Sequence, residues 1–262
     1  MSLRRMPLRR TAPGPLDEPT FSEQQGIRYL HFGTPWIQGA MSLRKPDRLV
    51  LEYTRQMMAW LLFLDPPEAP SAIGVLGLGA GSLVRFCLAH TGSPVRAVEW
   101  NPRVTAACRM LFRVPEDDER FEVVHADAGD WVADIAQRGS CPVLMVDLYD
   151  AEARGPVRDS VEFYRGCRQV VGGRAQAGVV AVNLFGSHDS FEPNIAHLNE
   201  AFDGRVALLP EIDEGNRVAL AFAGPPLQVD AAAVLARAET VEQQYLLPAR
   251  KWARSLMPAM RR

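Results

Sequence analysis

Three acidic residues stand directly after, or one residue beyond, apolar segments that the sequence predicts as β-strands. Because the carboxyl ends of neighbouring parallel strands meet at one edge of a sheet, we expect these side chains to share a single rim. An ionised carboxylate accepts hydrogen bonds and attracts cations, so such a rim suits sugar hydroxyls, ring amino groups and protonated amines. The three acids are Glu99, Asp127 and Asp147.

A glycine-rich turn over residues 77–82 (GLGAGS) connects an apolar strand to a helical pattern. Such a turn presents free N–H groups and the positive end of a helix dipole, which favours a nucleotide-type ligand. A dinucleotide fingerprint requires Gly or Ala at its third position, where this chain has Ser82. The spacing fits better a loop that holds S-adenosylmethionine, with Gly77, Gly79 and Gly81 against the ligand. As a bare pattern, it is equally compatible with a tight turn alone.

Glu99 and Asp127 are the candidates for binding the nucleoside part of such a ligand. A carboxylate at the end of the second strand accepts both ribose hydroxyls, which is the role we predict for Glu99. Asp127 ends the third strand, where it or the backbone of Ala128 would meet the adenine amino group. The structural alternatives are a solvent-exposed acid for Glu99 and a helix N-cap for Asp127.

The loop after the fourth strand supplies the candidates for catalysis. An amine nucleophile is mostly protonated at neutral pH, because an alkylammonium has a pKa of about 10. It needs anions to hold it and one base to accept its proton, and Asp147 and Asp150 can fill both roles. Tyr149, which stands between them, could line the substrate channel or simply pack. The alternative for the acids is to cap the next helix, which suits Asp150 better than Asp147.

The elements that must position these side chains alternate between strand and helix from Ile73 onward. Alternation of this kind requires right-handed crossovers and places the ligand at the carboxyl ends of the strands. The last two strands, at 205–209 and 217–222, are joined too closely for a crossover helix, so we expect them to be antiparallel. The preceding strands are predicted at Val95–Val98, 121–125, 142–146 and 178–184, and helices at 52–64, 160–171, 193–202 and 230–247.

The predicted fold class is therefore α/β. It is a Rossmann-like, seven-stranded methyltransferase sheet, mostly parallel with an antiparallel C-terminal hairpin, with helices on both faces and a small N-terminal β region. Short β segments are predicted at 27–32, 36–38 and 49–51. We divide the chain into a flexible basic and proline-rich arm (1–26), a β-hairpin region plus helix (27–70), the S-adenosylmethionine-type catalytic domain (71–225), and a C-terminal helix with a basic tail (226–262).

The composition is that of an ordinary globular protein. Apolar residues make up 47% of the 262 residues, charged residues 23%, and the net charge is −2, which favours neither nucleic acid nor an anionic membrane as a partner. No apolar run approaches the roughly 18–20 residues of a membrane span. The four cysteines lie far apart in apolar patterns, which favours reduced core thiols over disulfides or a zinc site. We expect a cytoplasmic protein without a metal.

Together these residues resemble the spermidine synthase (polyamine aminopropyltransferase) family, which has a class I S-adenosylmethionine-dependent methyltransferase-like fold. The resemblance covers roughly residues 35–225. Its most specific part is the run from Asp147 and Asp150 through the Gly-Pro at 155–156 to the Phe-Tyr at 163–164. The segments that carry it are the glycine turn at 77–82, Val98-Glu99, Asp127-Ala128, the block 146–150 (VDLYD), and the matches at 155–156 and 162–165.

The resemblance implies a role for each acid. Glu99 would hold the ribose, Asp127 would lie near the adenine, Asp147 would be the general base, and Asp150 would help to bind the polyamine. The co-substrate would be S-adenosylmethionine or its decarboxylated form, and the acceptor an amine or polyamine. Membership in this family of polyamine biosynthesis also implies a homodimer or homotetramer.

Two positions depart from the family pattern. Ala80 stands where the glycine turn usually carries an acid, which would pair with the amine of the decarboxylated donor and repel the carboxylate of the intact one. Arg55 replaces an acid that would face a cationic substrate. The leading hypothesis is a transferase that alkylates an amine. Methyl transfer to an unknown acceptor is a close second, and nucleoside binding without catalysis is a third alternative. Ala80 favours methyl transfer, whereas the absence of an Asn/Asp-Pro-Pro-aromatic motif speaks against it.

Overall fold

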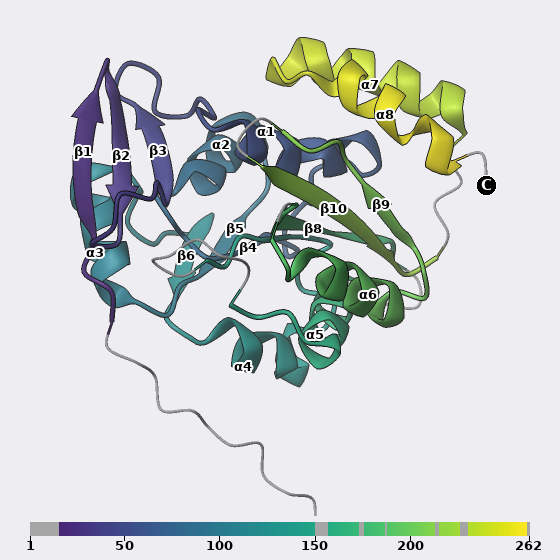
Figure 1. Ribbon diagram of the computed structural model, residues 1–262, viewed down its shortest axis with the longest axis horizontal. Helices are drawn as coiled ribbons and strands as arrows, with labels where there is room; N and C mark the ends of the chain where they lie inside the picture. The colour runs from purple at the N-terminus through teal and green to yellow at the C-terminus, as the bar shows by residue number, and fades with distance from the viewer. Residues whose placement is uncertain are drawn as a thin grey trace, which may run out of the picture.

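A seven-stranded sheet with the strand order β6-β5-β4-β7-β8-β10-β9 forms the centre of the molecule (Figure 1). The computed structural model describes residues 16–149, 157–172, 176–186, 188–212, 215–225 and 230–260. The first five strands in this order are parallel, and β10 is antiparallel to both β8 and β9, as predicted. The strands are β4 (Ile73–Leu76), β5 (Val95–Val98), β6 (Phe121–Val124), β7 (Val143–Val146), β8 (Gly178–Phe185), β9 (Val206–Leu208) and β10 (Asn216–Ala223).

The strand order reverses between β4 and β7. From β4 the chain runs outward through β5 to β6, and then returns to place β7 on the other side of β4. Crossover connections leave in opposite directions at such a switch point, so a crevice opens at the carboxyl ends of the two strands. The residues directly after β4 and β7 are Gly77 and Asp147, so two of the sequence-predicted site segments flank this point.

Two layers of helices cover the sheet. One face packs against α4 (Ala128–Ala133), α5 (Val161–Val171) and α6 (Phe191–Ala201), as Figure 1 shows. Side chains alternate between the two faces along a strand. Leu144 and Val146 of β7 therefore pack with these three helices, whereas Val143 and Met145 pack on the opposite face of the sheet. The other face packs against α1 (Glu52–Met57), the 3₁₀ helix η1 (Met58–Leu62), α2 (Ser82–His90), α3 (Pro102–Leu111), α7 (Ala231–Tyr245) and α8 (Ala249–Met260).

The N-terminal region differs from the prediction. It is a three-stranded antiparallel sheet of β1 (Thr20–Gln24), β2 (Ile27–His31) and β3 (Gly39–Ser42). β1 lies inside the segment predicted as an arm, β3 follows the predicted 36–38 strand, and 49–51 forms no strand. Gln25 and Gly26 both have positive φ and make the two-residue turn between β1 and β2. Every residue of β1 is exposed, so no apolar alternation marked it in the sequence.

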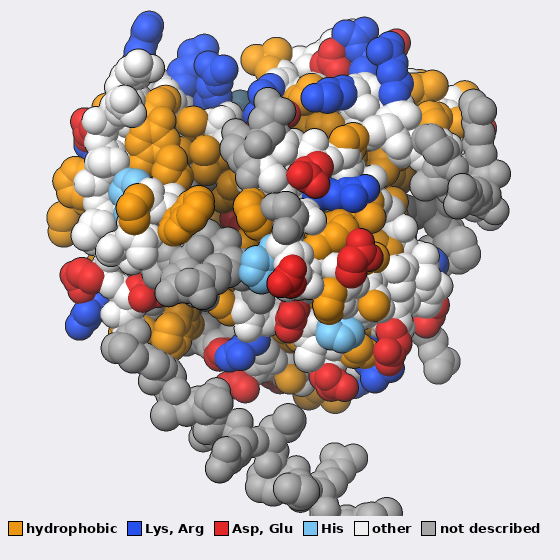
Figure 2. Space-filling model, in the orientation of Figure 1, with side chains coloured by type: hydrophobic (Ala, Val, Ile, Leu, Met, Phe, Trp, Pro, Cys, Tyr) orange, Lys and Arg blue, Asp and Glu red, His pale blue; other side chains and the backbone are white. Residues whose placement is uncertain are grey.

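The C-terminal region contains a second helix that the sequence prediction missed. α7 ends at Tyr245, the next residue, Leu246, has a left-handed φ of 55°, and α8 begins after Pro248. In α8 the basic side chains are exposed, while Trp252, Ala253 and Leu256 are buried. The charge of this stretch taken alone predicts a basic tail, because the buried residues between the basic ones are overlooked. In the view of Figure 2, Lys and Arg side chains lie at the upper right of the molecule, where Figure 1 places α7 and α8.

All four cysteines are buried and unbridged, as predicted. Burial raises the pKa of the Cys87 and Cys108 thiols to about 12, which keeps both protonated at neutral pH. In the part of the chain that the structure describes, none of the helices has the length and apolar character needed to cross a membrane.

Candidate active site

The glycine turn after β4 packs directly on the chain that leaves β7. Gly77, Gly79 and Gly81 have φ values of +90°, +49° and +70°, a region that favours glycine. A Cβ placed on Gly77 would lie 2.2 Å from the carbonyl oxygen of Asp147. The turn therefore requires glycine for its own conformation and for its contact with the neighbouring strand end.

Gly77→Ala is expected to lower the free energy of unfolding by at least about 3 kcal/mol, because it combines a strained φ with a backbone clash. Thermal unfolding followed by circular dichroism measures the loss. Gly92→Ala is the matched control, because no atom lies within 4 Å of a Cβ placed there. Equal unfolding temperatures for the two variants would contradict the geometry of this turn.

Glu99 is buried next to the glycine turn, with 7% of its surface exposed. One carboxylate oxygen accepts a hydrogen bond from the N–H of Leu78 at 3.1 Å, and the other accepts one from the N–H of Asn101 at 2.8 Å. Burial raises the pKa of Glu99, although these backbone bonds oppose the shift. Each oxygen keeps a second acceptor position, so the carboxylate orients the turn and can still accept hydroxyl donors. The exposed-acid alternative is wrong for Glu99.

Asp127 has the helix-capping geometry that we named as its structural alternative. Its side chain accepts hydrogen bonds from the N–H groups of Gly129 and Asp130, the first two residues after Ala128 in α4. It also forms an ion pair with Arg158. Burial alone would raise the pKa of Asp127, but Arg158 and the Gly129 N–H bring it below its ordinary value. Its approach to an adenine amino group, directly or through Ala128, stays a prediction.

Asp147 lies at the end of β7 between two hydrogen-bond donors from different elements. The hydroxyl of Tyr53 on α1 donates to one carboxylate oxygen at 3.2 Å, and the side-chain amide of Asn183 on β8 donates to the other at 2.9 Å. Burial raises the pKa of Asp147, and both donors oppose that shift. The result is a carboxylate that is fixed in direction, partly desolvated and supported in its ionised form.

Tyr149 follows Asp147 and donates its hydroxyl to the main-chain carbonyl of Asn183 at 3.0 Å. Burial raises the pKa of this phenol, so it stays protonated. Tyr149 therefore ties the loop after β7 to β8. The second predicted catalytic acid, Asp150, lies outside the described residues, as does the Gly-Pro at 155–156.

Sequence reasoning missed Tyr53 and Asn183 as site residues. Tyr53 matches the first residue of the family's Tyr-His/Gln-Glu segment, in which Arg55 replaces the acid, but no contact with the strand ends is predicted for it. No spacing rule connects its helix to β7. Asn183 carried a signal: it is a polar residue in an otherwise apolar strand, and it is 2% exposed. A buried amide requires hydrogen-bond partners, which the neighbouring strand ends supply here.

The two departures from the family pattern have distinct surroundings. Ala80 is 2% exposed and packs against β3, because a Cβ on Gly39 would lie 2.6 Å from the Cβ of Ala80. A longer acidic side chain at this position would press on the N-terminal sheet. Arg55 forms an ion pair with Glu52 on the same helix at 2.9 Å, so its charge has a partner at the surface.

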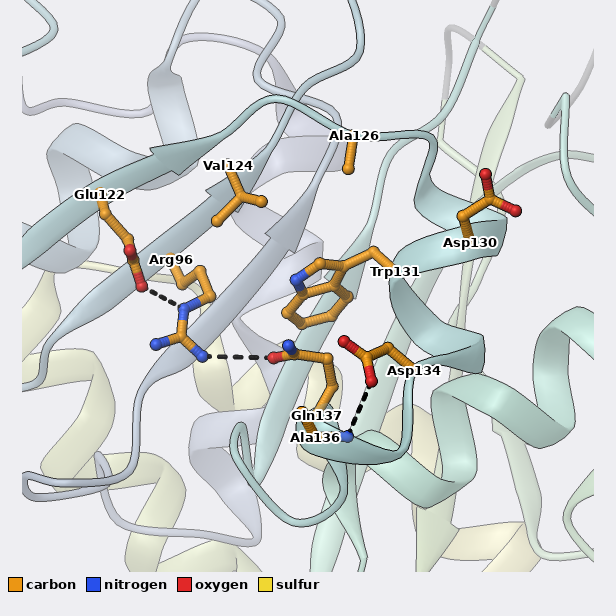
Figure 3. A pocket seen from close by; sticks show the side chains of 9 residues that line it. All are labelled: Arg96, Glu122, Val124, Ala126, Asp130, Trp131, Asp134, Ala136 and Gln137. Atoms are coloured by element: carbon orange, nitrogen blue, oxygen red, sulfur yellow. Dashed lines mark hydrogen bonds and ion pairs between the residues drawn. The ribbon is translucent and has the colours of Figure 1, made fainter.

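A hollow of about 590 Å³ lies between β5, β6 and the α4–η2 connection (Figure 3), where η2 is the short helix Ile135–Gln137. Arg96 spans it, paired with Glu122 and bonded to Gln137. None of the predicted site residues lines this hollow.

Comparison with known proteins gives a consistent result. No protein-family model matches the chain. The polyamine aminopropyltransferase of Neisseria meningitidis serogroup A is 33% identical over 244 residues, which cover 92% of this chain and 90% of that protein. A probable spermidine synthase from Corynebacterium glutamicum has a TM-score of 0.68 at 18% identity, covering 96% of this chain and 95% of that one. Human methyltransferase-like protein 13, in complex with SAH, has a TM-score of 0.63 at 23% identity, covering 76% and 94%.

The two solved structures establish the likeness of fold. The seven-stranded sheet with its antiparallel final hairpin and its glycine turn at the switch point is a class I methyltransferase-like fold, which confirms the predicted fold class. The chain belongs to the polyamine aminopropyltransferase (spermidine synthase) family of transferases, because the identity to the Neisseria protein extends over nearly its whole length.

Proposed function

We propose that this protein transfers an aminopropyl group from decarboxylated S-adenosylmethionine to the nitrogen of an amine or polyamine, with Asp147 as the general base. The observation that carries the proposal is the environment of Asp147. This carboxylate stands at the switch point of the sheet, oriented by Tyr53 and Asn183 and next to the glycine turn. Family membership supports the same reaction.

The nucleoside would bind along the glycine turn. Glu99 has acceptor positions left for the ribose hydroxyls after its two backbone bonds. Positive φ values in the turn bring its backbone close to the ligand without a Cβ between them. Asp127 or the backbone at Ala128 would contact the adenine.

The reaction is an in-line displacement at carbon. A nitrogen–carbon bond forms as the carbon–sulfur bond of the sulfonium donor breaks, and the electron pair stays on the sulfur. The nitrogen must give up one proton, and Asp147 accepts it. Tyr53 and Asn183 hold the carboxylate in one direction, which places the amine for attack.

Calorimetric titration of the full chain with the intact and the decarboxylated donor tests this proposal. We expect the decarboxylated donor to bind at least about tenfold more tightly, a difference of about 1.4 kcal/mol. Mass spectrometry of a diamine incubated with protein and donor should then show one added aminopropyl group. If neither donor binds, the proposal is wrong.

Methyl transfer from intact S-adenosylmethionine is the second candidate, and Ala80 favours it. No carboxylate stands at this point of the glycine turn to repel the carboxylate of the intact donor, and the position is closed by β3. Tighter binding of the intact donor, with one added methyl group on the acceptor, would favour this reaction over aminopropyl transfer.

A further inference from the structure

A second asparagine lies behind Asn183. In the antiparallel pairing of β10 with β8, Asn183 is opposite Val218 and Asn216 is opposite Phe185. The two asparagines are therefore diagonal neighbours, and strand alternation places their side chains on the same face of the sheet. The side-chain amide nitrogen of Asn216 donates a hydrogen bond to the side-chain oxygen of Asn183 at 3.0 Å.

This bond determines which end of the Asn183 amide faces Asp147. A carboxamide has a donor at one end and an acceptor at the other. The donor on Asn216 holds the oxygen of Asn183, so the NH₂ group points to the carboxylate of Asp147, 2.9 Å away. If the amide turned over, an oxygen would face the carboxylate and the hydrogen bond would be lost.

We propose that Asn216 is a positioning residue that acts through Asn183, keeping a hydrogen-bond donor on Asp147 and thereby keeping that carboxylate ionised and correctly directed. The consequence for turnover rests on the proposed function, in which Asp147 is the base. The orientation of the amide does not depend on it.

The surroundings of Asp147 give the hydrogen-bond relay from Asn216 through Asn183 to Asp147 a large influence on the ionisation of this carboxylate. The titratable groups that face it among the described residues are the hydroxyls of Tyr53 from α1 and Tyr149 from the following loop. β8 and β10 contribute only the neutral amides, because Arg217 stacks over Phe191 on the other face. Burial raises the pKa of Asp147, so the donors on it decide how far the carboxylate remains ionised.

Asn216→Asp reverses the relay with almost no change in shape. A carboxylate at position 216 only accepts hydrogen bonds, so it competes with Asp147 for the NH₂ group of Asn183, and whenever the amide turns toward it, the oxygen of Asn183 faces Asp147. We expect the pKa of Asp147 to rise and the acidic limb of the kcat profile to move to higher pH. The added negative charge would also raise this pKa directly, so the orientation effect has to be separated from the charge effect.

A double-mutant cycle with Asn183→Leu makes that separation. In the Asn183→Leu background, Asn216→Asp acts on Asp147 by charge alone, because no amide remains to turn. The pKa of Asp147 is followed directly by the ¹³C chemical shift of its carboxyl carbon, assigned with Asp147→Asn. Circular dichroism checks that each variant is folded.

The relay predicts that Asn216→Asp raises the pKa of Asp147 by at least about one pH unit more in the Asn183 protein than in the Asn183→Leu background. Equal increases in both backgrounds overturn it. If the carboxyl resonance shows the difference but the kcat profile does not move, the relay stands and the assignment of Asp147 as base fails.

Discussion

Asp147→Asn should lower kcat by about 10³-fold, the range expected for the loss of a general base, while leaving donor affinity within about twofold. The substitution removes the proton acceptor and preserves the shape. An amide at this position can still offer its oxygen to Asn183 and its NH₂ group to the hydroxyl oxygen of Tyr53. The fold and the nucleoside site should therefore be retained.

Steady-state kinetics and calorimetric donor titration measure the two quantities separately. Asp130→Asn is the matched control, because Asp130 is an exposed acid on α4 that receives the same chemical change. Both kcat and donor affinity should stay at wild-type values in that control. Unchanged turnover in Asp147→Asn would remove Asp147 from the role of base.

The opposite pattern is expected for Glu99→Gln: donor affinity should fall about 10–100-fold, while kcat at saturating donor changes little. Two backbone N–H groups point at the carboxylate of Glu99, from Leu78 and Asn101. A glutamine has only one oxygen for them, so its NH₂ group would face one of these donors and the glycine turn would lose its anchor. The ribose hydroxyls would lose part of their acceptor at the same time.

The effect of Glu99→Gln on stability has two opposing parts: the lost backbone hydrogen bond lowers the stability, whereas the loss of a buried ionised carboxylate raises it at neutral pH. Burial raises the pKa of Glu99, so the folded state binds more protons than the unfolded chain just above the ordinary pKa of the group. Ionisation of Glu99 therefore lowers stability as the pH rises, and the glutamine variant does not have this cost.

Glu122→Gln, which removes a carboxylate paired with Arg96 outside the site, is the control for donor affinity. Equal donor affinities in wild type and Glu99→Gln would exclude Glu99 from the nucleoside site.

The sequence alone determined the features that depend on local rules. Strand ends were marked by the change from an apolar run to a charged or glycine residue. Local capping rules likewise account for the start of α3, where Asn101 accepts the N–H of Arg103 and Pro102 is the first helical residue. Because parallel strands meet at their carboxyl ends, the positions of Gly77 and Asp147 at one crevice followed from the strand pattern.

Only the tertiary structure decided which partners these residues have. Tyr53 reaches Asp147 because α1 packs over the sheet, and Asn183 with Asn216 reaches it through strand pairing. The ion pair of Asp127 with Arg158 likewise joins segments with no local relation. Side-chain direction along an element is periodic and can be read from sequence, whereas contact between elements depends on packing that no local pattern encodes. The positions of Glu99 and Asp147 at the strand ends were therefore predictable, and the hydrogen bonds that set the direction and ionisation of these carboxylates were not.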